Sequence, residues 1–392
     1  MILSKETILN KTLNKILNKS TVSFVLIQFI VFAFAVKYSS RFTDYYLLVG
    51  LSAVILQTII WTKQNYIKKI ASKFSINLIF VDILLLLLLI FFSTNIFARI
   101  PIEGLNVDRW SVIIAFWDTF FAGGYAYAAK SHMGNPPGPM PFYFLIALPF
   151  YLLNLIDYLS LLGIFIFYSI MLHQKFEPQH RTAALLLILS STFYMWEICT
   201  RSNLFLNSSL ILLGMVLFVG VKNYSKFSNQ LIIGILLGLF LSTRNVFAMC
   251  YIVLFMYFLK SKQISLGAIF KISVIIFLVF VFTFFPFVIN FQADFLANNP
   301  FTIQSNVLIP SYLTLAIVFF SSFLFLFCRN NIDIFFYSGT ILFVTICIHF
   351  IYHIILDSFW VAFFGSKADI SYFIFCIPFF YYFLLCSKKQ PQ

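Results

Sequence analysis

Residues 75–98 read SINLIFVDILLLLLLIFFSTNIFA, an apolar run with a single charged residue, Asp82. An α-helix rises about 1.5 Å per residue, so roughly 20 apolar residues cross the ~30 Å hydrocarbon core of a bilayer. Similar runs recur along the whole chain. The sequence therefore predicts an all-α fold, a polytopic bundle of transmembrane helices.

The composition argues against a soluble globular fold. Of the 392 residues, 61% are hydrophobic and only 10% are charged, and the mean hydropathy is +0.97. Soluble domains carry about 25% charged residues. The net charge of +13 comes from short Lys and Arg clusters between apolar runs rather than from one basic module. We therefore expect membrane lipids, and no nucleic acid, as partners.

The sequence carries no cofactor signature. The six cysteines lie in or beside apolar runs without the spacing of a disulfide framework or a zinc site. His349 and His353 are one helical turn apart, so their spacing allows metal binding, but this pair alone is a weak signal for a metal site. A glycine-rich nucleotide fingerprint is also missing. We expect no metal, no cofactor and no nucleotide-sugar donor.

About twelve spans (11–13) are predicted from the apolar runs. Their approximate ranges are 22–36, 45–62, 75–98, 141–172, 182–199, 204–221, 229–242, 246–259, 272–289, 309–328, 333–350 and 371–387. The range 141–172 is long enough for one broken span or for two short ones. We expect an odd number of crossings there, because two spans would move most downstream basic residues outside.

Cytoplasmic N- and C-termini place most of the 26 Lys and Arg residues inside, as the positive-inside rule requires. Three regions follow: residues 1–98, with an amphipathic cytosolic segment over 1–20 and three spans; the exterior loop 99–140; and the remaining bundle, 141–392. The first apolar run resembles a secretory signal, but no small-residue cleavage site follows it, so we expect an uncleaved span. The composition favours a bacterial inner membrane.

The loop 99–140 is the longest polar excursion, and it is too aromatic to be disordered. Charges near span ends on the exterior side are few, and unpaired charge beside hydrocarbon often marks a site. Cations that converge with a carboxylate suit a lipid-linked phosphate donor, with the carboxylate as base for an incoming hydroxyl. The residues concerned are Asp108, Arg109, Asp118, Lys130, Arg201 and Arg244.

Three stretches together resemble a known family. Asp108 is followed by a Pro-Pro element that opens a span, NPPGPMPFYFLIAL at 135–148; further on come CTRSNLFLN at 199–207 and LSTRN at 241–245. This pattern, over roughly residues 100–260, resembles the GT-C membrane glycosyltransferases, particularly the protein mannosyltransferase and lipid A aminoarabinose transferase branch. Asn135 stands where the family often has a basic residue, and Asn207 where it often has an acidic one.

The resemblance implies transfer of a sugar from a polyprenyl-phosphate donor to a lipid, glycan or protein acceptor on the exterior face. Asp108 would be the catalytic base. The residues expected to bind substrate are Arg109, Asp118, Lys130, His132, Asn135, Arg201 and Arg244.

Structural interpretations stay open for the same residues. Asp108 or Asn106 would make a good N-cap for a surface helix over 109–121. Arg201 and Arg244 could be interface anchors. Asp369, in the last exterior loop, could bind an acceptor or only keep that loop hydrated.

Two other functions remain as alternatives to the transferase. A transporter or flippase of a lipid-linked glycan would also need many spans and exterior cations, but the chain shows no internal repeat and its charges collect at one face. A surface polysaccharide polymerase or ligase would carry its main residues in a large later loop, and 290–308 contains only Asp294 among charged residues.

Overall fold

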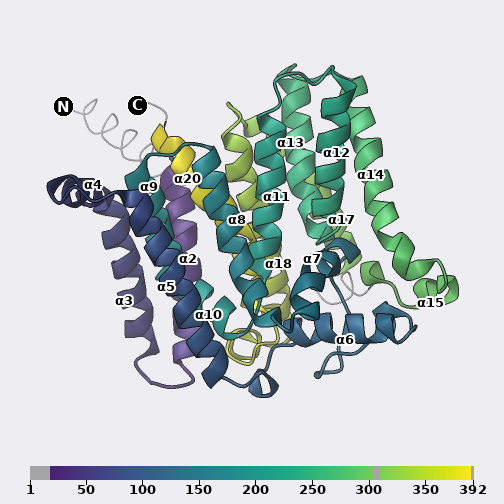
Figure 1. Ribbon diagram of the computed structural model, residues 1–392, viewed down its shortest axis with the longest axis horizontal. Coiled ribbons are helices and arrows are strands. Elements are labelled where there is room, and N and C mark those ends of the chain that lie inside the picture. The colour runs from purple at the N-terminus through teal and green to yellow at the C-terminus, as the bar shows by residue number, and fades with distance from the viewer. Residues whose placement is uncertain (1–17, 303–308, 390–392) are drawn as a thin grey trace.

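The computed structural model describes residues 18–302 and 309–389, and this part of the chain is helical without strands. Most helices run side by side, and α6 lies across one end of the bundle (Figure 1). We name this the α6 end. The helix α2 begins and α20 ends at the opposite end. The all-α prediction is confirmed, whereas the expected amphipathic segment lies almost wholly outside the described residues.

The helices in chain order are α2 (Lys19–Ser39), α3 (Tyr46–Thr62), α4 (Gln64–Lys73), α5 (Leu78–Arg99), α6 (Arg109–Phe121), α7 (Pro141–Leu152), α8 (Leu159–His173), α9 (Pro178–Leu189), α10 (Thr192–Cys199), α11 (Leu204–Val219), α12 (Phe227–Leu241), α13 (Ala248–Lys260), α14 (Leu266–Val288), α15 (Gln292–Ala297), α17 (Ser311–Ser321), α18 (Asp333–Leu356), α19 (Phe359–Phe363) and α20 (Ile377–Lys389). Short 3-10 turns are η1 (Ile102–Gly104), η2 (Ala126–Ala128), η3 (Ile156–Tyr158), η4 (Asn245–Phe247), η5 (Leu324–Phe327) and η6 (Ile370–Cys376).

Each expected span overlaps a helix or a pair of helices. Within the described residues, six helices are long and apolar enough to cross a membrane, or up to eight if each of two bent pairs forms one span. Five further apolar helices are shorter, between 10 and 17 residues. A helix such as α12, with 15 residues, reaches only about 22 Å. The structure is thus consistent with a membrane protein, and twelve spans remain a prediction.

The predicted span 141–172 is interrupted in the structure. The helix α7 ends at Leu152, and Asn154 then adopts a left-handed φ of 56°, which asparagine tolerates well after a helix. The chain resumes through η3 into α8, and together these form one 18-residue candidate span, Ile156–His173. The expected span 182–199 is likewise bent by 58° between α9 and α10.

Glycines bring the helices of the bundle close together. On α12, a Cβ at Gly234 would lie 2.7 Å from the Ile275 side chain, and one at Gly238 would lie 2.8 Å from the Ile276 carbonyl oxygen of α14. On α8, a Cβ at Gly163 would lie 2.6 Å from the backbone nitrogen of Leu206 in α11. Small residues at helix contacts are typical of packing inside membranes, where helices gain little from hydrophobic association.

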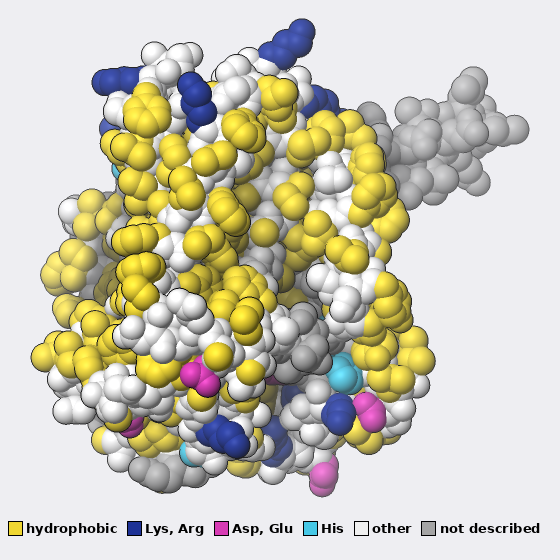
Figure 2. All heavy atoms as spheres, turned by 90° about the vertical axis from the view of Figure 1, so that its right-hand side faces the viewer, with side chains coloured by type: hydrophobic (Ala, Val, Ile, Leu, Met, Phe, Trp, Pro, Cys, Tyr) yellow, Lys and Arg dark blue, Asp and Glu magenta, His cyan; other side chains and the backbone are white. Residues whose placement is uncertain are grey.

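The surface of the bundle is apolar around its middle. Figure 2 shows hydrophobic side chains over most of the face on the α14 side, with charged side chains toward the two ends. On α14, Leu266 and Phe282 are each 71% exposed. Contiguous apolar surface of this kind is rare on soluble monomers and is expected where lipid covers the protein.

One ion pair is buried inside the bundle near the opposite end. The Asp82 carboxylate on α5 accepts hydrogen bonds from Arg181 Nε at 2.6 Å, Thr182 Oγ1 at 2.6 Å and Tyr168 OH at 3.1 Å. Both charged side chains are almost fully buried. A buried charge needs such partners, so this pair joins α5 to α8 and α9.

Candidate functional site

Asp108 precedes the first residue of α6. Its side chain makes no capping hydrogen bond with the helix. Instead, Oδ2 accepts hydrogen bonds from Ser131 Oγ at 2.8 Å and from Asn135 Nδ2 at 2.7 Å. The Ser131–Asn135 turn is closed by its own backbone bond of 2.9 Å. These contacts fix the carboxylate and leave its Oδ1 without a hydrogen bond to any described residue.

Arg109 is held in place by three hydrogen bonds. Its Nη1 donates to Ser202 Oγ, and its Nη2 donates to Asp369 Oδ2 and Ser371 Oγ, each at 2.7 Å. Burial by itself lowers the pKa of Arg109, but the neighbouring Asp369, Tyr372, Glu197 and Asp108 side chains, with Asp369 foremost among them, together outweigh burial and raise it overall. The guanidinium therefore stays charged and joins α6 to the start of α11 and to η6.

Arg244 is a partly buried arginine of this end whose donors are open. Among the described residues it makes no hydrogen bond or ion pair, and its buried Nε has no partner. Electrostatic interactions link it with Tyr372, Tyr143, Arg109 and Asp108. Burial lowers the pKa of Arg244. A half-buried guanidinium without a counterion is costly, so this position suits an anionic ligand.

The turn that carries Arg244, residues 241–245, packs against the Pro-rich stretch 135–148, which lies about a hundred residues earlier in the sequence. The backbone nitrogen of Met140 donates to the Thr243 carbonyl at 3.2 Å, and that of Tyr143 donates to the Ser242 carbonyl at 3.3 Å. The N-terminus of α7 therefore packs on the turn between α12 and η4. Two stretches that the resemblance selected separately, 135–148 and 241–245, meet at this point.

Further polar atoms lie buried beside these residues. Glu197 Oε1, on α10, accepts a 2.9 Å hydrogen bond from the Phe205 nitrogen in the first turn of α11, where the helix dipole favours an anion. Its Oε2 has no partner, and neither do the side-chain oxygens of Asn203 and Asn207. Buried polar atoms are nearly always hydrogen-bonded, so unpartnered ones gathered in one place favour a site for a polar ligand or for water.

We name Asp108, Arg109, Glu197, Arg244 and Asp369 the α6-end cluster. Electrostatic interactions link Arg109 with the three acidic members, and Arg244 with Asp108 and Arg109. The sequence patterns did not point to Glu197 as a site residue, and they left the role of Asp369 open. An acidic residue inside an apolar run was the signal for Glu197. No pattern in the sequence around Asp369 marked it as a site residue, because its partner, Arg109, lies 260 residues away.

Arg201 is engaged elsewhere. It donates to the carbonyl oxygens of Cys199 at 2.9 Å, Phe97 at 3.1 Å and Ile100 at 2.6 Å, and it lies 3.4 Å from the Asp157 carboxylate. The last two carbonyls belong to the end of α5, which this side chain caps. The contacts favour a structural role for Arg201 over the expected binding of donor phosphate.

The other expected site residues lie around the cluster. His132 Nδ1 is 2.7 Å from Ser111 Oγ, and its ring stacks on Trp110 at 5.1 Å. Asp118 accepts a 2.6 Å hydrogen bond from Tyr151, and the Lys130 side chain is exposed. Among the described residues, no three His, Cys, Asp or Glu side chains gather to hold a metal ion.

Comparison of the chain with models of protein families, with curated proteins and with solved structures finds no match. The fold and the α6-end cluster together define a class of protein: a helical bundle with an apolar surface of the kind that lipid covers, and with a charged, partly buried site at one end. A carboxylate with one open oxygen and an arginine with open donors can together accept a proton and bind an anion.

Proposed function

We propose that the protein is a membrane glycosyltransferase of the GT-C type, which moves a sugar from a polyprenyl-phosphate donor to an acceptor hydroxyl. One observation carries the proposal: the stretch 135–148 is hydrogen-bonded both to Asp108, through Asn135, and to the turn that carries Arg244, and the buried Arg244 Nε there has no partner. The resemblance at 135–148 and 241–245 supports the same reading, because these stretches are in contact.

In this proposal, the Arg244 guanidinium binds the donor phosphate. Asp108 accepts the proton of the acceptor hydroxyl while that oxygen forms a bond to the anomeric carbon. The bond between the anomeric carbon and the phosphate oxygen breaks, and the leaving polyprenyl phosphate keeps the electron pair. Charge on this leaving phosphate grows during the reaction, so a cation held beside it stabilises the transition state more than the ground state.

The proposed topology places the α6 end on the exterior face and both termini in the cytoplasm of a bacterial cell. The basic residues at the opposite end support it, because cytoplasmic loops are enriched in Lys and Arg. Four of these residues lie in or beside α4: Lys63, Lys68, Lys69 and Lys73.

Transfer from radiolabelled polyprenyl-phosphate sugars, measured in membranes that contain equal amounts of each variant, tests the proposal. Asp108→Asn keeps the shape of the side chain and can still accept the two hydrogen bonds, so the fold should survive. Loss of a general base typically lowers the rate by about 10²–10⁴-fold. The matched control is Asp44→Asn, which changes an exposed carboxylate in the α2–α3 loop at the same end.

Transfer by wild type and Asp44→Asn that collapses in Asp108→Asn would support the enzyme and its base. Equal transfer in all three proteins would remove Asp108 from the mechanism. If wild type transfers no sugar from any donor, the glycan transporter or flippase becomes the better reading, and a flipping assay in vesicles is the next measurement.

A further inference from the structure

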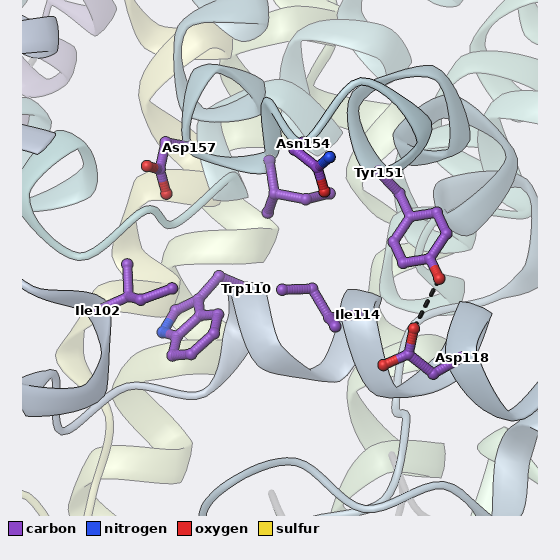
Figure 3. Close-up of a pocket in the computed structure, with 8 residues that line it drawn as sticks. Ile102, Trp110, Ile114, Asp118, Tyr151, Asn154 and Asp157 are labelled. Atoms are coloured by element: carbon purple, nitrogen blue, oxygen red, sulfur yellow. Dashed lines mark hydrogen bonds between the residues drawn. The ribbon is translucent and has the colours of Figure 1, made fainter.

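A pocket of about 360 Å³ lies between α6 and the break that follows α7 (Figure 3). One wall is a face of α6, on which Trp110, Ile114 and Asp118 are spaced four residues apart. Tyr151 and Asn154 contribute to the opposite wall. Its volume falls within the range of about 300–1,000 Å³ typical of small-molecule sites.

The chemistry of the lining is acidic and aromatic. Asp118 and Asp157 are its charged groups, and neither lysine nor arginine lines it. Asp118 accepts a hydrogen bond from Tyr151, and Asp157 lies beside Arg201. Two carboxylates without a lining cation disfavour an anionic ligand, because like charges repel across a short distance. The lining therefore does not suit the donor phosphate.

Trp110 gives a second, independent sign of a ligand. The residue is only 7% exposed, it lines the pocket, and its indole nitrogen is buried without a hydrogen-bond partner. A buried N–H group without a partner costs free energy, which a small rotation of the indole ring toward a ligand oxygen in the pocket would recover. The combination of an aromatic ring, carboxylates and an amide suits a hydroxyl-rich molecule with apolar C–H faces, which is the chemistry of a pyranose ring.

We propose that this pocket binds a sugar residue of the acceptor, neutral or amino-bearing, and rejects acidic sugars. The inference rests on the proposed function, because the pocket is lined by α6, the helix that begins directly after the expected base, Asp108. A ligand in the pocket lies along α6, whereas the open arginine, Arg244, belongs to the turn between α12 and η4. Acceptor and donor then approach Asp108 from different elements of the fold.

Direct binding to the purified full chain in lipid nanodiscs tests the pocket without any donor. The probes are glucose, glucosamine and glucuronic acid, detected by saturation-transfer NMR. Ile114→Trp fills the pocket, and Asp118→Asn removes one carboxylate with little change of shape. Leu296→Trp is the control, because it adds the same ring at a side chain that is 81% exposed on α15.

We expect saturable binding of glucose and glucosamine, and binding of glucuronic acid that is about tenfold weaker or more, equivalent to about 1.4 kcal/mol. Ile114→Trp should lose binding by a similar factor, whereas Leu296→Trp should match wild type. Asp118→Asn should weaken glucosamine more than glucose, because only the amino sugar carries a positive charge. Thermal unfolding of each variant identifies any loss of binding that comes from misfolding.

Absence of saturable binding, or equal binding by wild type and folded Ile114→Trp, would overturn the pocket. The proposed transferase activity and the proposed sugar pocket can be refuted independently of each other. Sugar binding that depends on Ile114 and Asp118, together with no transfer from any donor, keeps the pocket and rejects the transferase. Transfer whose acceptor KM is unchanged in both variants keeps the transferase and rejects the pocket.

Discussion

Arg244→Ala and Arg201→Ala should have different effects on activity and on stability, although the two arginines look alike in the sequence. Arg244 bonds to no described residue, and its Nε is buried without a partner. Arg201 bonds to three backbone carbonyls and pairs with Asp157. The first should therefore lose activity and keep its stability, and the second should lose stability.

The magnitudes follow from the hydrogen bonds involved. Two bonds from Arg244 to a phosphate, at about 1.5–3 kcal/mol each, contribute about 3–6 kcal/mol. One factor of ten in rate corresponds to about 1.36 kcal/mol, so Arg244→Ala should lower kcat/KM by roughly 10²–10⁴-fold. Arg201→Ala leaves three carbonyls without this donor, at about 1–3 kcal/mol each where they stay buried, so unfolding should become easier by about 3 kcal/mol or more.

Two measurements on the same detergent-solubilised preparations decide the matter: transfer from the radiolabelled donor and the midpoint of thermal unfolding. Arg244→Lys is a useful third protein, because it keeps the charge and loses the planar fork. The reasoning is refuted if Arg244→Ala unfolds well below wild type. It is also refuted if Arg201→Ala keeps its unfolding midpoint and loses transfer.

Three further predictions concern the fold. Asp82→Asn should lower the free energy of unfolding by about 3–5 kcal/mol in chemical denaturation, because it leaves a buried arginine unpaired; an unchanged midpoint would contradict this. Burial by itself raises the pKa of Asp369, but Arg109, the hydrogen bonds from Ser371 and the charge of Lys37 together outweigh burial and hold that pKa below its usual range. The Asp369 carboxylate therefore stabilises the fold above about pH 3.9, and that contribution disappears as the pH falls through the lower folded pKa. Wild type should thus lose stability more steeply in acid than Asp369→Asn, and the two thermal unfolding curves should converge there; parallel curves would argue against the pair. Gly163→Ala should destabilise by about 1–3 kcal/mol through overpacking, whereas Gly267→Ala, with open space around it, should be neutral or stabilising; equal unfolding midpoints would contradict the close approach at Gly163.

Much of the fold could be read from hydropathy, because lipid-facing helices must be apolar along their length. The predicted run 75–98 corresponds to α5, and 333–350 lies within α18. The positions at which a predicted span breaks or bends were harder to predict from the sequence. Asn154 in a left-handed conformation and the bend between α9 and α10 depend on packing that periodicity does not report. Span number stays open for the same reason, since several apolar helices are short.

The candidate site was predictable only where its residues belong to local patterns. Asp108 and Arg244 could be selected because charges at span ends are few. The roles of Arg109 and Arg201 could not be told apart, because each role depends on partners from other parts of the chain. Which groups an arginine binds depends on the tertiary structure. The order of charges along the sequence does not show which of them already have a hydrogen-bond or ion-pair partner.

The long-range partners of Arg109 also set an order of assembly during synthesis. Asp369 follows Arg109 by 260 residues. At ~5–20 residues per second, a ribosome needs roughly 13–50 s to reach that counterion. Until then, seating the guanidinium between the helices would bury it without its ion pair. The contacts of α6 are therefore complete only after Asp369 has been made, and a nascent chain that stops before this residue lacks the ion pair of the cluster.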